Sequence, residues 1–307
     1  MSKVIQSILA LVIITAVIGI NNAYAVPDCT AAGVKEDLKT NEMYVGSSTG
    51  GLVKVDTNDA KTCKVGDMKF GAIPVLCTDL ALDSTQPDLY GNTKLYCVTF
   101  TDLYEIDRKT AAATFIGNLV DTTKPLSIFV TDMNGMEIDF GGLAYAISDS
   151  GKLYRVDLTD GTLLLLKDFM EQSSGDLAWE STTGNLFWTS NTCPGCPAGV
   201  DGLYEIDLSV VPPTSTFIGP IGFTDVFATD FVDMSPNIFY VNFAGLLIET
   251  DTAATPVGTT MTDPKVAAFG GTANQALVGG ILQAIDQLEL IINGFESIST
   301  WFTSGAI

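Results

Sequence analysis

The chain has 307 residues, and 36 acidic side chains against 15 basic ones give it a formal net charge of −21. A surface this acidic repels nucleic acid and anionic lipid, so neither is an expected partner. The sequence contains no histidine, which excludes Ser-His-Asp and Cys-His catalytic arrangements as well as a histidine-ligated catalytic metal.

Residues 1–25 have the features of a secretory signal peptide. They carry one cation, Lys3, then an apolar run over 8–20, and they end on the small-x-small sequence of 23–25, just before Val26. The apolar run is shorter than the roughly 20 residues that a membrane span requires, although a retained anchor is the alternative. We therefore expect an exported protein, whether extracellular, periplasmic or on the cell surface, that is not an integral membrane protein after cleavage.

A short phrase recurs five times along the rest of the chain. The copies are GGLVKVD at 50–56, TDLYEID at 101–107, GKLYRVD at 151–157, DGLYEID at 201–207 and AGLLIETD at 244–251. Their closing aspartates are Asp56, Asp107, Asp157, Asp207 and Asp251. The first four stand 50 or 51 residues apart and the last follows after 44. A period of this length holds several short strands and is typical of a β-propeller.

Three further strands accompany each phrase. An apolar strand precedes it, and a strand ending in a hydrophobic residue and glycine follows it in four copies. A fourth strand lies upstream, at 79–83, 135–139, 176–180 and 230–233, with 33–37 as a plausible first copy. Four strands per repeat make one propeller blade. We expect an all-β propeller over residues 26–262 with five detectable four-stranded blades, five or six in total. Residues 263–271 could supply a degenerate strand, and ring closure stays open.

One repeat resembles a known type of blade. Leu186-Phe187-Trp188-Thr189, followed by Leu203-Tyr204-Glu205-Ile206-Asp207, is similar to the blades of YWTD and NHL-type propellers. The resemblance covers roughly residues 30–262. It implies ligand binding on a propeller face, with a protein or a glycan as the ligand, and it does not identify that ligand.

The C-terminal segment, 263–307, changes period. Thr272-Ala-Asn-Gln275 reads as a helix capping box. Apolar residues then fall three or four apart, at Leu277, Ile281, Ile285, Leu288, Ile292 and Phe295. This pattern predicts an amphipathic helix over about 272–302. We expect it to cover the propeller or to join copies of the chain in a homo-oligomer, because so apolar a stripe must be buried.

Six cysteines in an exported chain predict disulfides. Cys193 and Cys196 form a CxxC pair that could staple a loop, serve as a redox pair or supply half of a zinc site. Cys29, Cys63, Cys77 and Cys97 lie in the first two repeats, and their three possible pairings stay open.

Aligned acidic residues give one candidate metal site. Asp79, Asp176 and Asp230 open the upstream strand in three repeats, with Gly135 at the matching position of a fourth. In a propeller this strand lines the central channel, so three carboxylates at its mouth could bind Ca²⁺. Alternatively, each aspartate bonds to backbone N–H groups of its own blade. A catalytic use is the third possibility.

Other recurring residues suggest structural roles. A second acidic level, Asp83, Asp139 and Glu180, and the closing aspartates repeat because each blade needs the same turn. Four aromatic residues could either stack against sugars or pack between blades: Trp179, Trp188, Tyr240 and Phe243.

Three functional hypotheses follow. The first is a non-enzymatic binding scaffold that uses loops on one propeller face. The second is a calcium-dependent hydrolase similar to the lactonase-like and esterase-like propellers, with Asp79, Asp176 and Asp230 around the metal. The third is a structural envelope component assembled through the C-terminal helix.

Overall fold

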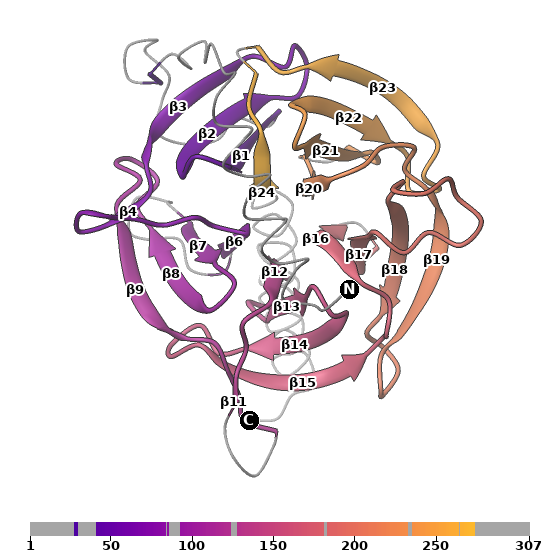
Figure 1. Ribbon diagram of the computed structural model, residues 1–307, viewed down its shortest axis with the longest axis horizontal. Coiled ribbons are helices and arrows are strands. Elements are labelled where there is room, and N and C mark those ends of the chain that lie inside the picture. Colours follow the sequence, from indigo (N-terminus) through magenta and orange to yellow (C-terminus); the bar gives the residue numbers. More distant parts are fainter. Residues whose placement is uncertain are drawn as a thin grey trace, which may run out of the picture.

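A computed structural model describes residues 28–29, 41–83, 85, 93–123, 128–180, 183–232, 235–263 and 265–273. Its strands form six sheets, and five of them are arranged around a central axis, as Figure 1 shows. The expected all-β propeller is confirmed, with five blades. Nowhere in the described ranges is there a helix long and apolar enough to cross a membrane.

Each blade contains four antiparallel strands that follow one another outward from the axis. Blade one consists of β24 (Ala268–Ala273), β1 (Glu42–Ser47), β2 (Gly51–Asp56) and β3 (Thr62–Asp67). Blade two consists of β6 (Asp79–Asp83), β7 (Lys94–Val98), β8 (Asp102–Ile106) and β9 (Ala113–Asn118). Blade three consists of β12 (Met133–Ile138), β13 (Ala144–Ser148), β14 (Lys152–Val156) and β15 (Thr162–Asp168).

The last two blades have the same order. Blade four consists of β16 (Ser173–Glu180), β17 (Asn185–Ser190), β18 (Gly202–Asp207) and β19 (Thr214–Pro220). Blade five consists of β20 (Val226–Phe231), β21 (Ile238–Asn242), β22 (Leu246–Thr250) and β23 (Pro256–Met261). Two short hairpins extend the connections that precede blades two and three. They consist of β4 (Lys69–Phe70) with β5 (Ile73–Pro74), and β10 (Val120–Asp121) with β11 (Ile128–Phe129), which adds to the outer edge of blade three.

The repeated phrase is the third strand of every blade, and its closing aspartate builds the turn to the fourth. In all five blades a side-chain oxygen of this aspartate accepts a hydrogen bond from the backbone N–H two residues later, at 2.7–3.0 Å. An aspartate that bonds its own backbone in this way stabilises a turn. The repetition of the aspartate therefore has a local structural cause.

Strands from the two ends of the described chain close the ring. β24 pairs with β1 as the innermost strand of blade one. The propeller therefore extends to Ala273, past the boundary expected at 262. The predicted capping box is wrong in its first two residues, because Thr272 and Ala273 belong to this strand. The rest of the predicted helix and its proposed oligomer contact, the first-strand copy at 33–37 and the signal peptide lie outside the described residues.

Glycine makes this closure possible at one point. A Cβ atom on Gly270 would lie 2.3 Å from the Cα of Asp79 on the neighbouring inner strand β6. Since no real side chain tolerates that distance, the approach of β24 to β6 requires a residue without a side chain. The equivalent position on the inner strand of blade three is also a glycine, Gly135, opposite Ile147.

The hydrophobic core lies between the blades, divided into five clusters, one for each interface between neighbours. Trp188 and Tyr240 are fully buried in it, and the ring of Trp179 stacks on Tyr145 of blade three at 6.5 Å between centroids. Packing between blades is therefore the role of these three aromatic residues. Phe243 differs, since it is 37% exposed in the connection between β21 and β22.

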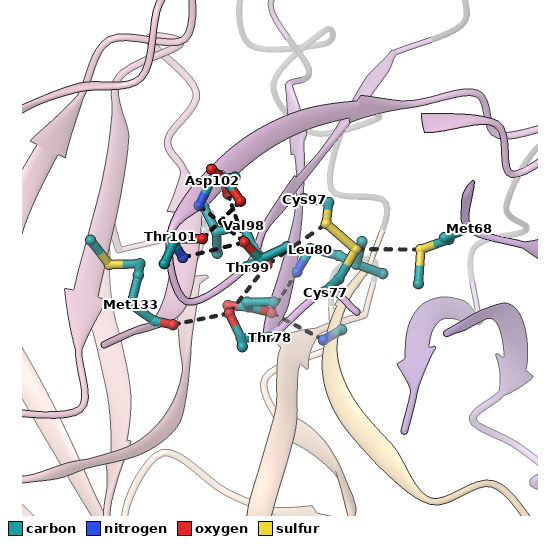
Figure 2. The surroundings of a disulfide bond; sticks show 12 residues. Met68, Cys77, Thr78, Leu80, Cys97, Val98, Thr99, Thr101, Asp102 and Met133 are labelled. Atoms are coloured by element: carbon teal, nitrogen blue, oxygen red, sulfur yellow. Dashed lines mark hydrogen bonds between the residues drawn. A yellow bond between two sulfur atoms is a disulfide. The ribbon is translucent and has the colours of Figure 1, made fainter. Parts of the chain in front are cut away.

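All six cysteines are paired, as Cys29–Cys63, Cys77–Cys97 and Cys193–Cys196. Cys77 and Cys97 are buried at the inner end of blade two (Figure 2), where the Met68 sulfur lies 3.4 Å from Cys77 Sγ. Beside them, the Thr78 hydroxyl lies 3.1 Å from the carbonyl oxygens of both Val98 and Met133. This contact links blades two and three.

Candidate functional site

Four carboxyl groups surround the axis, on the inner strands of blades two to five. They belong to Asp79, Glu137, Asp176 and Asp230, and each is at most 4% exposed. In every case the backbone N–H of the next residue donates to the carboxyl group, at 2.7 Å. The sequence alignment found three of the four and overlooked Glu137.

The strand registers correct the predicted alignment. Asp79 lies opposite Val98, and Asp176 holds the same position, because the next pairs, Leu80 with Cys97 and Leu177 with Trp188, are equivalent. Two residues further along their strands come three other groups: Glu137 opposite Tyr145, Asp230 opposite Phe239 and Thr272 opposite Tyr44. Asp230 therefore does not share a level with Asp79 and Asp176. The alignment failed here because side chains two residues apart face the same side of a strand.

Asp79 of blade two accepts hydrogen bonds from both neighbouring blades. Its Oδ1 accepts from the N–H of Gly271 in blade one at 3.1 Å, besides that of Leu80. Its Oδ2 accepts from the N–H of Met136 in blade three at 2.6 Å. Hydrogen bonds to a buried carboxyl group from neighbouring inner strands hold those strands at a fixed separation.

Asp176 and Asp230 continue these links around the ring. Asp176 Oδ2 accepts from the Thr229 N–H, which joins blade four to blade five. The Thr272 hydroxyl donates to Asp230 Oδ2 at 3.2 Å, which joins blade five to blade one. Between blades three and four the link is an amide, since Asn134 Nδ2 donates to the Ser173 carbonyl at 3.3 Å.

Burial governs the charge of these groups. It raises the pKa of Asp79 well above its ordinary value, and it does the same for Asp176, where the charge of the neighbouring Asp79 adds to the effect. The pKa of Glu137 is also well raised, first by burial and then by the charge of Asp230. A carboxyl group in such surroundings holds its proton to a higher pH than one in water.

The donor set does not fit the predicted calcium site. Ca²⁺ takes about six to eight oxygen ligands, whereas both oxygens of Asp79 and of Asp176 already accept backbone hydrogen bonds. Within the ranges that the structure describes, no three carboxylate or thiolate side chains are arranged to hold a metal ion. The geometry favours the hydrogen-bonded alternative, with the difference that the bonds reach neighbouring blades. The hydrolase hypothesis stays a prediction.

The second acidic level also serves local structure. Asp83 Oδ1 accepts from the Thr85 N–H at 2.9 Å, and Asp139 Oδ1 accepts from the Leu143 N–H at 2.8 Å. In blade four, Glu180 bonds to the Thr183 hydroxyl. All three residues stabilise the turn that follows an inner strand.

A groove of about 920 Å³ lies between blades two and three, and we call it the interblade groove. Its origin is visible on the second strand of each blade, where two side chains pack toward the preceding blade. These pairs are Met43 and Val45, Leu95 and Cys97, Ala144 and Ala146, Leu186 and Trp188, and Ile238 and Tyr240. Blade three therefore has two alanines where the others have larger residues, and Ala144 lines the groove.

Both walls of the interblade groove combine apolar and polar residues. Blade three contributes Ala144, Val156, Leu158 and Leu163 together with Arg155 and Asp157. Blade two contributes Phe115 and Ile116 together with Asp83, Lys94, Tyr96 and Glu105. A groove with apolar residues and a few polar groups is typical of a binding site, and its volume lies in the usual range of about 300–1,000 Å³.

The polar groups that blade two contributes to the groove can both donate and accept hydrogen bonds. Lys94 Nζ lies 3.1 Å from Glu105 Oε2, and the two side chains are 43% and 40% exposed. An exposed pair of this kind contributes at most about 1 kcal/mol, so either partner can turn to a ligand. Burial raises the pKa of Tyr96, which keeps its hydroxyl protonated and able to donate. Sequence comparison within each blade did not reveal this site, although comparing the residue sizes between blades would have revealed it.

Comparison with known proteins gives low sequence identities and TM-scores below 0.5. No protein-family model matches the chain, and no curated protein matches it. A chain from the crystal structure of a nidogen/laminin complex is 11% identical, with a TM-score of 0.49 over 75% of this chain and 97% of that one. A protein of unknown function from Bacteroides caccae is 11% identical, with a TM-score of 0.39 over 72% and 73%. A chain from the mitotic checkpoint complex is 12% identical, with a TM-score of 0.37 over 59% and 48%.

Proposed function

We propose that the protein is an exported, non-enzymatic binding scaffold that holds an extended segment of a partner protein in the interblade groove. The observation that carries the proposal is the combination of apolar residues and polar groups along both walls of this groove. The apolar residues suit the side chains of a peptide, and the polar groups suit its backbone N–H and C=O groups. Of the two aromatic side chains that line the groove, Tyr96 is 5% exposed and Phe115 is 40% exposed, so only Phe115 offers ring surface for stacking a sugar.

Export is supported by the cysteines. All six form disulfides, and disulfides persist in oxidising compartments rather than in the cytosol. Two of the three pairs include residues that are at most 5% exposed. Oxidation is therefore part of how the chain folds.

Ala144→Leu gives a sharp test because it fills the groove with a residue that blade architecture already accepts. Leu95 and Leu186 occupy the equivalent positions in blades two and four. The experiment selects binders from a phage-displayed library of random linear peptides on the oxidised wild-type protein. The affinities of the selected peptides are then measured for the wild type, Ala144→Leu, Lys94→Ala and the control Lys152→Ala. Lys152 is on β14 and does not line the groove.

Peptides that use the groove should bind Ala144→Leu at least about tenfold more weakly, which corresponds to about 1.4 kcal/mol. Lys94→Ala should weaken binding by a smaller factor, and Lys152→Ala should leave it unchanged. Equal binding to wild type and Ala144→Leu, with both proteins folded, would move the site elsewhere. Failure to select any peptide, combined with binding to immobilised glycans that Ala144→Leu abolishes, would keep the groove and replace the ligand class.

A further inference from the structure

The connection between β17 and β18 is longer than its counterparts. It contains eleven residues, Asn191–Asp201, whereas the equivalent connections of the other four blades contain three each. The additional residues include the sequence Cys193-Pro194-Gly195-Cys196, which forms a disulfide. Neither the binding groove nor the closure of the ring involves this loop.

Hydrogen bonds fix both ends of the loop without help from the disulfide. At its start, the Tyr204 hydroxyl donates to the Thr192 carbonyl at 2.8 Å, and the Gln172 N–H donates to the Thr192 hydroxyl at 3.2 Å. At its end, the Asp201 N–H donates to the Phe223 carbonyl at 2.8 Å. The strands on either side therefore stay in place whether Cys193 and Cys196 are joined or not.

The tip of the loop stands in solvent. Pro194 and Gly195 are exposed, and Cys193 and Cys196 are half-buried. A Cβ atom built on Gly195 would meet no atom within 4 Å, so space is open beside the disulfide. An attacking thiolate can reach a sulfur only where such access exists.

The other two disulfides have a different setting. Cys77 and Cys97 are at most 1% exposed, and they join residues 20 apart in sequence. Cys29 is 5% exposed and is joined to the half-buried Cys63, 34 positions away. Cys193 and Cys196 are three residues apart, and the shortest loop constrains the unfolded chain least. The third disulfide is thus the most accessible and contributes least to the stability of the fold.

We propose that Cys193–Cys196 is a thiol–disulfide exchange site that reacts with a dithiol. A thiolate of the dithiol attacks one sulfur, forms a mixed disulfide and releases the other cysteine as a thiolate, which takes a proton from water. The second thiol of the dithiol, as its thiolate, then attacks the mixed disulfide and releases the remaining cysteine. The dithiol is oxidised to a disulfide, and the cysteine pair gains two electrons and two protons.

The test is partial reduction of the oxidised full chain under native conditions, with dithiothreitol as the small dithiol and reduced thioredoxin as the protein dithiol. Free thiols are trapped with a maleimide and located by peptide mass mapping. Cys193 and Cys196 should be labelled at least about 100-fold faster than the four other cysteines, with an unchanged near-ultraviolet circular dichroism spectrum and melting temperature. Reaction with both reagents indicates a site open to macromolecules, and reaction with dithiothreitol alone restricts it to small dithiols.

Two results would overturn the proposal. One is labelling of Cys193 and Cys196 only together with the other two pairs or only on unfolding. The other comes from the double variant Cys193→Ser/Cys196→Ser, which should fold, keep the wild-type melting temperature and lose the fast labelling. If that variant fails to fold or melts at a clearly lower temperature, the disulfide is a structural staple.

Discussion

Asp201 should make the unfolding free energy depend on pH, and the substitution Asp201→Asn should remove this dependence. The residue directly precedes β18 and is 2% exposed. Its Oδ2 accepts from the Val226 N–H at 2.8 Å, which links blade four to blade five. Burial raises the pKa of Asp201 to about 7, with a smaller contribution from the charge of Asp225.

The direction of this pH dependence follows from the pKa of Asp201 in the folded and in the unfolded chain. An aspartate in an unfolded chain has a pKa of about 3.9, so the folded protein holds this proton more tightly. The stability that Asp201 contributes is fully present below pH 3.9 or so and is lost as pH rises through about 7. Because one pKa unit corresponds to about 1.36 kcal/mol, ionising the buried carboxyl group lowers the unfolding free energy by about 4 kcal/mol.

Asp201→Asn keeps an oxygen that can accept from Val226 and removes the ionisation. Its unfolding free energy should match that of the wild type within about 1 kcal/mol at pH 4 and exceed it by up to about 4 kcal/mol at pH 8. Urea unfolding followed by tryptophan fluorescence at pH 4, 6 and 8 measures both values. Asp225→Asn is a suitable control because Asp225 is exposed, and it should change the pH profile little. Parallel pH profiles for Asp201→Asn and the wild type would contradict a raised pKa of Asp201 in the folded protein.

Three further predictions concern the axis and the core. Asp79→Ala leaves three buried N–H groups without an acceptor, so urea unfolding should show a loss of about 3 kcal/mol or more; wild-type stability would contradict the links between blades. Cys77→Ala/Cys97→Ala opens a link across 20 residues and should cost about 3 kcal/mol in the same assay, whereas no change would mean that the buried pair contributes nothing. Calorimetric titration with Ca²⁺ should show no stoichiometric binding to the wild type, because both oxygens of Asp79 and of Asp176 accept backbone hydrogen bonds. A one-to-one binding heat that Asp79→Asn/Asp176→Asn/Asp230→Asn abolishes would restore the metal site.

The repeats predict the blades because every blade needs the same turn between its third and fourth strands. A closing aspartate bonds its own backbone two residues later in all five copies, so its spacing reports the blade length directly. Ring closure has no such local signal. Gly271 of the closing strand β24 stands where the other inner strands have larger residues, and its close approach to Tyr44 and Ala228 follows from tertiary structure rather than from the repeat.

The candidate sites were only partly predictable for a similar reason. Strand position placed Asp79 and Asp176 at the axis, but their partners, Met136 and Thr229, lie in neighbouring blades and follow from tertiary structure. The interblade groove depends on the small size of Ala144 relative to its counterparts. A motif search detects residues of a given type, whereas this groove arises because the side chain of Ala144 is smaller than those at the equivalent positions.

The most direct test of binding in the interblade groove is hydrogen exchange of the wild-type protein with and without a peptide selected from the random library. The peptide should slow exchange in β7, in β14 and in the turn over 141–143, which border the interblade groove, and Ala144→Leu should remove this protection. Protection confined to the connections at 99–101, 149–151 and 243–245 would contradict it, because those residues lie outside the groove.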